Sequence, residues 1–379
     1  MATSNTLTGL IPVLYDALDV VANEPAGLSK AVARDVKADM AAKGQTVRSP
    51  VAPAASLEAI TPGATPAASG GQTFAYKDIT LSKAYAAPIL WSGEEQKSVA
   101  GHYQTMFADQ VKQAFRTFRN TIDSDLAALY AKASRAVGTA GTTPFASAGD
   151  FSDFANSLKV LDDNGAEGDL QMVLDSSAIA NIRSKQSILF KANEAGTVDL
   201  LRNGIIGQVE GLNVRQSKGI KKHTKGTGSS YVLDGAVAVG DTTISIKTGS
   251  GTVLAGDVIV ITGDANKYVV TTGATAAGDI VIAAPGIQQV SADGTAMTIQ
   301  SSNTSNLFFE RSAIQLATRV PAVPEGGDSA DDRMTITDPV TGIVYDISMY
   351  RQYKQVKIEI GLVWGYEVIK PEFLGILLG

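Results

Sequence analysis

The chain has 379 residues, of which 44% are apolar and 18% charged, and its formal net charge is −6. This composition is typical of a folded protein of two or three domains, and the negative charge argues against a protein that coats nucleic acid or an anionic membrane. The sequence contains no cysteine, which excludes disulfides, thiolate catalysis and iron–sulfur clusters.

The start of the chain shows neither a secretory signal nor a membrane anchor. Residues 1–25 lack a basic region followed by a long apolar core. No run in the sequence approaches the roughly 18 consecutive apolar residues that a membrane helix needs. We therefore expect the protein to be made in the cytoplasm, or in a particle assembled there, without a membrane partner.

Residues 1–44 are predicted to form a helical N-terminal arm. Apolar residues recur every three or four positions over 7–22, which predicts an amphipathic helix. A second helix is predicted over Leu28–Ala42 and is closed by Gly44. Its apolar residues are four positions apart: Val32, Val36 and Met40.

Residues 45–92 are predicted to form a long extended loop. Proline and glycine are frequent between 50 and 71, and both disfavour a packed element. Alternating apolar and polar residues after this stretch predict a protruding pair of strands. A loop of this length usually acts outside its own monomer, so we expect it to contact another subunit. The aromatic candidates for that contact are Phe74, Tyr76 and Tyr85.

A long helix is predicted to follow the loop. Ser92 and Glu95 have the spacing of a capping box at its start. Apolar residues then recur every three or four positions, which predicts a helix over 94–137 with a kink at Gly101. At about 1.5 Å per residue it would be roughly 65 Å long, so we expect a structural strut. Its apolar face would comprise Tyr103, Phe107, Val111, Phe115, Phe118, Ile122, Leu126, Leu129 and Ala133.

The rest of the chain mixes helices and strands, which predicts an α+β fold with an inserted all-β domain. Between 235 and 303, glycine and threonine are frequent, and turn signals separate short runs of period two. This pattern predicts a β-barrel or β-sandwich inserted into the α/β chain. Elsewhere, helices are predicted over 151–163 and 176–188, the latter capped by Asp175 or Ser176, and strands over 170–174, 204–217, 314–320 and 356–368.

The stretch VRQSKGIKKHTKGTGSS, residues 214–230, is the strongest candidate for a binding site, because it holds five cations and no carboxylate. It does not match the GxxxxGK[ST] phosphate loop, since its lysine precedes the second glycine. Nucleic-acid contact is less favoured than a solvated hinge, because no aromatic residues interleave the charges. We interpret His223 as part of that linker. The lysines expected to contact an acidic neighbouring subunit are Lys221, Lys222 and Lys225.

We predict no catalytic, cofactor-binding or metal-binding residue. His102 and His223 are far apart in the sequence and belong to no metal-ligand motif. Adjacent carboxylates do not face each other across a substrate as glycosidase acids do. A GxSxG elbow and an EF-hand loop are both missing, so an enzyme is the weakest hypothesis. The carboxylate pairs concerned are Glu94–Glu95, Asp162–Asp163 and Asp331–Asp332.

The order of the predicted elements, from helical arm to closing strand, resembles the major capsid protein of tailed bacteriophages over nearly the whole chain. RNTIDSDLAALYAKAS (119–134) resembles the end of that family's long spine helix. NLFFERSAIQLATRVP (306–321) is similar to a family strand in which an aromatic pair precedes Ala-Ile-x-Leu. VKIEIGLVWGYEVIKPEFLGILLG (356–379) resembles its closing strand. The inserted β module resembles the insertion domain of the short-tailed-phage branch.

This resemblance implies the tailed-phage capsid protein fold, with peripheral and axial domains around the spine helix. The insertion domain would support folding of the subunit and contacts between capsomers. The implied divisions are an N-terminal arm (1–44), an extended loop (45–92), the first part of the core with the spine helix (93–234), the inserted domain (235–303) and the second part of the core (304–379).

The resemblance also implies a function. The protein would be a structural subunit that forms pentamers and hexamers of an icosahedral shell around viral double-stranded DNA, without a cofactor. Scaffolding and portal proteins would be further partners, and DNA would be contacted only non-specifically. The subunit would be found in the virion capsid, and in the host cytoplasm during assembly. Two alternatives stay open, an encapsulin-like nanocompartment and a surface adhesin or S-layer-like protein.

Overall fold

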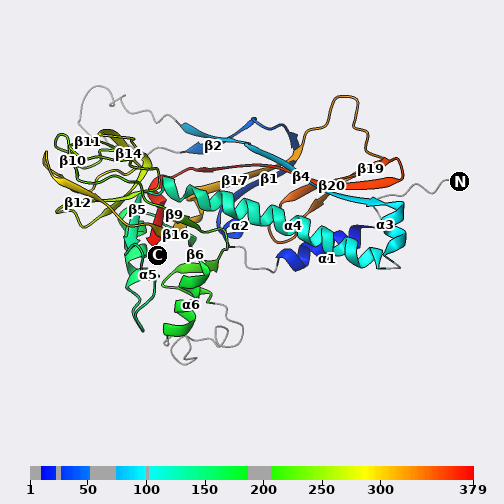
Figure 1. Cartoon of the computed structure of the whole chain (residues 1–379), viewed down its shortest axis with the longest axis horizontal. Coiled ribbons are helices and arrows are strands. Elements are labelled where there is room, and N and C mark those ends of the chain that lie inside the picture. Colours follow the sequence, from blue (N-terminus) through cyan, green and yellow to red (C-terminus); the bar gives the residue numbers. More distant parts are fainter. Residues whose placement is uncertain (1–9, 23–26, 52–73, 100–101, 187–205) are drawn as a thin grey trace, which may run out of the picture.

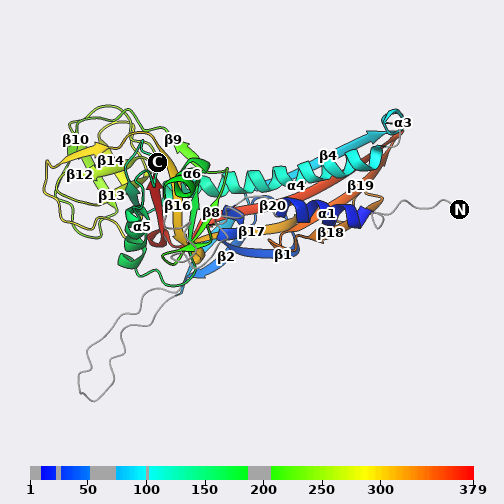
Figure 2. The same ribbon diagram turned by 90° about the horizontal axis from the view of Figure 1, so that it is seen from below.

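The computed structural model describes residues 10–22, 27–51, 74–99, 102–186 and 206–379. The molecule is elongated, and the helix α4 (Tyr103–Ala127) runs along much of its length beside a sheet (Figure 1). The inserted β module lies at one end of this helix, and α3 (Gly93–Ser98) lies at the other (Figure 2). None of the helices in the described ranges is long and apolar enough to cross a membrane.

Within the described residues, six strands form the sheet beside α4. The 14-residue strand β20 is its central member and pairs with β4 on one side and with β17 and β19 on the other. Every second residue of β20 from Ile358 to Trp364 is buried, which confirms the predicted strand. The six strands are β1 (Ala33–Ala41), β17 (Ile314–Pro321), β20 (Gln355–Val368), β19 (Val344–Gln352), β18 (Asp332–Thr337) and β4 (Lys83–Ser92).

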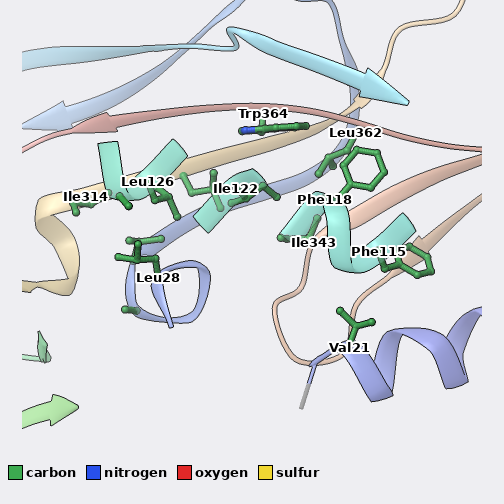
Figure 3. Packing of buried hydrophobic residues seen from close by; sticks show 14 of the residues in the cluster. Val21, Leu28, Phe115, Phe118, Ile122, Leu126, Ile314, Ile343, Leu362 and Trp364 are labelled. Atoms are coloured by element: carbon green, nitrogen blue, oxygen red, sulfur yellow. The ribbon is translucent and has the colours of Figure 1, made fainter. Parts of the chain in front are cut away.

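The apolar face of α4 packs between this sheet and the helix α1 (Ile11–Ala22), so both predicted helices are present (Figure 3). The Phe115 ring meets Tyr345 edge to face at 5.0 Å, and Phe118 meets Trp364 at 6.2 Å. Trp364 Nε1 donates to Asp125 Oδ2 at 3.1 Å. The buried apolar residues of α4 are Phe107, Val111, Ala114, Phe115, Phe118, Ile122, Leu126 and Ala127.

The predicted helix 94–137 is wrong in its extent. The capping box is confirmed, since Glu95 Oε2 accepts from the Ser92 N–H at 2.7 Å, but α3 ends at Ser98. Gly101 lies outside the described residues. After Ala127 the chain tightens into a 3₁₀ turn, η2 (Ala128–Lys132), and continues as β5 (Arg135–Gly138). The long-range pairing of β5 with the C-terminal strand overrides the local helical pattern.

The second helix of the N-terminal arm is also wrong. The helix α2 covers only Leu28–Ala31, and the following residues form β1, which runs parallel to β17. Positions 32, 36 and 40 are four apart, but they also share one parity, so their spacing fits one face of a strand as well as a helix. Arg319 Nη2 binds Asp35 Oδ2 at 2.9 Å and fixes this pairing.

The extended loop is shorter than predicted. Strands β2 (Thr46–Val51) and β3 (Ala75–Thr80) form the expected ribbon, and residues 52–73 between them lie outside the described ranges. Residues 83–92, by contrast, form β4 and pair along β20. A Cβ on Gly365 of β20 would lie 2.2 Å from the Thr80 carbonyl oxygen, so only glycine lets the chain pass this closely from ribbon to sheet.

A second sheet lies next to η2 at the end of α4. The helices α5 (Ser152–Asp163) and α6 (Ser176–Lys185), which were both predicted, pack against this sheet and form an apolar core with it. The Asp175 carboxylate caps α6 by accepting from the Ser177 and Ala178 N–H groups. The strands of this part are β5, β21 (Leu374–Leu378), β16 (Asn303–Glu310), β6 (Leu170–Leu174), β8 (Leu212–Gln216), β7 (Gln208–Val209) and β9 (Lys221–His223).

Within the continuous stretch 206–379, the predicted β insertion is a closed barrel of six strands around its own apolar core. It closes because β12 pairs with both β13 and β15, and β13 also pairs with β5. The chain enters the barrel after His223 and returns at Asn303, which are paired neighbours on β9 and β16. Its strands are β10 (Tyr231–Leu233), β11 (Thr243–Lys247), β12 (Val258–Ile261), β13 (Lys267–Thr272), β14 (Gly278–Ile282) and β15 (Ala296–Ile299).

The packing of α4 gives a first prediction. Phe115→Ala should lower the free energy of unfolding of the purified protein by about 3–5 kcal/mol, because its ring is 1% exposed and leaves a cavity. Met106→Ala on the same helix is the control, and since Met106 is 45% exposed its effect should stay within about 0.5 kcal/mol. Denaturant unfolding measures both. Equal losses would contradict the described packing.

Candidate functional site

The six residues predicted to contact other subunits fall on three separate parts of the structure. Phe74 and Tyr76 belong to the β2–β3 ribbon, and Tyr85 belongs to β4 in the six-stranded sheet. The three lysines lie at the junction between the second sheet and the barrel, on or just after β9. The fold therefore separates Tyr85 from Phe74 and Tyr76, which were all predicted to lie in the extended loop.

The ribbon presents its aromatic side chains to solvent. Phe74 is 62% exposed and Tyr76 is 63% exposed, whereas Ile79 on the same strand is fully buried. Large apolar rings that stay exposed in a folded chain often mark a surface that another protein covers. The ribbon is thus a candidate contact surface, defined here by Phe74 and Tyr76.

Tyr85 differs from the ribbon residues because its own chain already engages it. It is 53% exposed, but its ring centroid lies 5.5 Å from that of Trp364. The Lys83 ammonium lies 5.9 Å from the same ring, within the range of a cation–π contact. Part of the Tyr85 surface therefore supports the sheet.

The three lysines are not equivalent. Lys221 is half-buried and its ammonium donates to Ser124 Oγ on α4. Lys222 and Lys225 are exposed, so these two residues carry the accessible positive charge. Nearby, Arg215 Nε donates to Gln171 Oε1 at 2.9 Å, and burial lowers the pKa of its guanidinium. The stretch is an ordered strand and turn, more integrated than the predicted solvated hinge.

The interpretation of His223 as part of a solvated linker is wrong. Its side chain is 5% exposed, its Nε2 lies 2.8 Å from Asp257 Oδ1, and its Nδ1 lies 2.9 Å from the Tyr130 hydroxyl. These partners come from the barrel and from η2, respectively. Sequence reasoning missed the arrangement because both partners are distant in the chain. The alternation within β9, where His223 is the inward residue, is the one local signal.

A groove between β4 and α4 was not predicted at all. It has a volume of about 590 Å³ and is flanked by Leu90 and Met106, which are 47% and 45% exposed. Polar side chains of α4 line its other wall, among them Gln110, which accepts from Trp91 Nε1 at 2.7 Å. The groove offers apolar contact area beside a few hydrogen-bonding groups, among them the Asp109 carboxylate.

One carboxylate of each adjacent acidic pair has a structural partner within the chain. The hydrogen bond from the Ser92 backbone N–H lowers the pKa of Glu95 below its ordinary value, as a capping box requires. Asp163 binds Lys159 and Arg135, and Asp331 binds Arg351. Over the part of the chain that the structure describes, no three His, Cys, Asp or Glu side chains are grouped so as to hold a metal ion.

No protein-family profile and no curated protein sequence matches this chain. A chain of the cyanophage P-SCSP1u capsid aligns with 94% of this chain and 88% of its own length, at 12% identity and a TM-score of 0.50. The chain has the fold of a phage capsid protein.

Two further structures align at lower scores. A chain from the capsid of Ralstonia phage GP4 covers 93% of this chain and 87% of its own length, at 10% identity and a TM-score of 0.49. A virus-like particle from Pyrococcus furiosus covers 97% and 99%, at 10% identity and a TM-score of 0.44. The predicted α+β capsid fold with an inserted β domain is confirmed by the cyanophage match and the barrel.

The position of Tyr85 in this capsid fold gives a second prediction. Tyr85→Ala should lower the free energy of unfolding of the protein by about 1 kcal/mol, because the ring pair with Trp364 is lost. Phe74→Ala is the matched control at an exposed aromatic position and should change it by less than about 0.5 kcal/mol. Thermal unfolding of the purified variants compares them. A larger loss for Phe74→Ala would contradict this division of the aromatic residues.

Proposed function

We propose that this protein is a major capsid protein, a structural subunit that self-assembles into an icosahedral shell around viral double-stranded DNA. The observation that carries the proposal is the capsid fold, which aligns with the cyanophage capsid chain along 94% of this sequence. The subunit acts through contacts and not through catalysis. It belongs in the virion capsid, after assembly in the host cytoplasm.

The shape of the subunit supports this role. The β2–β3 ribbon and the groove beside α4 leave apolar side chains exposed, and repeated subunits in a closed shell can cover such surfaces. The proposed partners are further copies of the chain in pentamers and hexamers, together with scaffolding and portal proteins. The net charge of −6 supports only non-specific contact with packaged DNA.

Assembly is the third prediction. Purified subunits, alone or with a scaffolding protein, should form shells or capsomer rings of megadalton size in electron microscopy. Particles recovered from infected cells should contain double-stranded DNA. Particles filled with a host enzyme would instead support the nanocompartment alternative, which shares the fold. A monomer under all assembly conditions would contradict both.

The ribbon is proposed as one contact surface between subunits. Phe74→Ser with Tyr76→Ser should reduce the yield of shells about tenfold or more, because two exposed rings no longer bury apolar area against a neighbour. The circular dichroism spectrum and melting temperature of the free subunit should not change. Val290→Ser, at a 66% exposed position on the barrel, is the control. Normal shell yield from the double variant would contradict this assignment.

A contact with an acidic neighbouring surface is proposed for the basic junction. Lys222 and Lys225 are its exposed members, and Lys221 supports the strand through Ser124. Opposite charges at such a contact increase the rate of association and fix the relative position of the two surfaces more than they increase affinity. The contribution of these lysines to assembly should therefore weaken as salt is added.

We propose that the chain is organised as an arm, a loop, a core and an insertion, and that the inserted barrel is a separate folding unit. Replacing residues 224–302 by Asn-Gly joins His223 to Asn303, which are already paired, through a two-residue turn. The shortened chain should refold with a lower soluble yield than the full chain, because β5 loses its pairing with β13. Sedimentation after refolding measures this yield. An unchanged yield would contradict a folding role for the barrel.

A further inference from the structure

Two buried side chains and one half-buried side chain connect the barrel to the end of the long helix. Tyr130 belongs to η2, His223 to β9 and Asp257 to the turn before β12. The Tyr130 hydroxyl lies 2.9 Å from His223 Nδ1, and His223 Nε2 lies 2.8 Å from Asp257 Oδ1. The chain of hydrogen bonds thus begins on the helix and ends inside the barrel.

Asp257 fixes the direction of these hydrogen bonds. Its carboxylate is fully buried and accepts from the N–H groups of Gly226, at 3.0 Å, and Leu254, at 2.7 Å. Because this carboxylate already accepts two hydrogen bonds, its contact with His223 requires a proton on Nε2. In the neutral imidazole, Nδ1 is then the acceptor for the Tyr130 hydroxyl. Burial raises the pKa of Tyr130, and the Asp257 charge raises it further, which keeps the hydroxyl a donor.

Gly256 closes the space in front of the hydroxyl. A Cβ at this position would lie 2.6 Å from Tyr130 Cε2 and 3.1 Å from both the Tyr130 hydroxyl and His223 Nδ1. The barrel turn therefore packs directly against the two rings, whose centroids are 5.6 Å apart. A substrate has no room here, so the resemblance to a nucleophile–histidine–acid triad has no catalytic meaning.

The 3₁₀ form of η2 places Tyr130 for this contact. An α-helix turns about 100° per residue and a 3₁₀ helix about 120°, so three residues beyond Ala127 the two differ by roughly 60°. A continued α-helix would therefore aim the Tyr130 side chain away from His223. The contact between Tyr130 and His223 therefore requires the 3₁₀ form of η2.

We propose that Tyr130, His223, Asp257 and Gly256 form a latch that locks the barrel onto the spine helix and holds residues 128–132 as a 3₁₀ turn. When the latch opens, η2 and the segment 221–226 loosen together. The barrel keeps its own strands, because its core and its closure through β12 and β13 do not involve Tyr130 or His223.

Two matched pairs of variants test the latch in the full chain. Gly256→Ala and Gly263→Ala both place a side chain at positive φ, +93° and +92°, but a Cβ at Gly263 meets no atom within 4 Å. Tyr130→Phe removes the hydroxyl that reaches His223. Tyr268→Phe removes a hydroxyl that bonds Asp264 within the barrel.

Amide hydrogen exchange, read by mass spectrometry, compares residues 128–132 and 221–226 with strands β11 and β14. Gly256→Ala and Tyr130→Phe should each speed exchange in the first two segments by roughly five- to tenfold and leave β11 and β14 unchanged. Gly263→Ala and Tyr268→Phe should leave the first two segments unchanged. If Gly256→Ala does not fold, Tyr130→Phe still decides.

Two results would overturn the latch. One is unchanged exchange in both segments for Tyr130→Phe, because the hydroxyl would then contribute nothing to docking. The other is an equal acceleration in β11 and β14, because the network would then belong to the core of the barrel and would not separate the barrel from the helix.

Discussion

The structure depends on the burial of one wide face of α4. This helix has 25 residues, and alone in water it would leave a continuous row of aromatic and aliphatic side chains exposed. It is covered by α1 on one side and by the sheet around β20 on the other. Because β20 is long enough to follow the helix, one strand and one helix together set the elongated shape of the molecule.

Much of this architecture follows from sequence periodicity, and the exceptions have identifiable physical causes. The period of α4 and the alternation of β20 are long and regular, so local pattern and tertiary packing agree there. In β1 the local pattern and the tertiary packing disagree. Apolar residues spaced by four are compatible with a helix and with a strand, and pairing with β17, about 280 residues later, makes this segment a strand. The end of α4 is a similar case. The alanine-rich residues 127–133 favour a continued helix, but the next residues form β5 and pair with β21 in a sheet.

The sequence allowed the candidate contact residues to be selected by residue type, but it did not show which other residues of the chain they contact. Phe74 and Tyr76 are exposed, and among the described residues they are not part of a buried apolar cluster. Tyr85 has the same alternating context but lies against Trp364, which is far away in the sequence. His223 shows the limit most clearly. Its charged neighbours in the sequence predicted an exposed side chain, whereas the imidazole is buried and binds the carboxylate of Asp257, 34 residues later.

The insertion of the barrel between two paired strands has a consequence for the order of folding on the ribosome. The strands of the barrel pair among residues 231–299, so they can form while residues 300–379 are still to be synthesised. The long sheet cannot, because β1 and β4 wait for β17 and β20. Contacts of such high sequence separation form slowly. The emerging chain therefore carries a folded internal domain while its N-terminal strands are still unpaired, the reverse of simple vectorial folding.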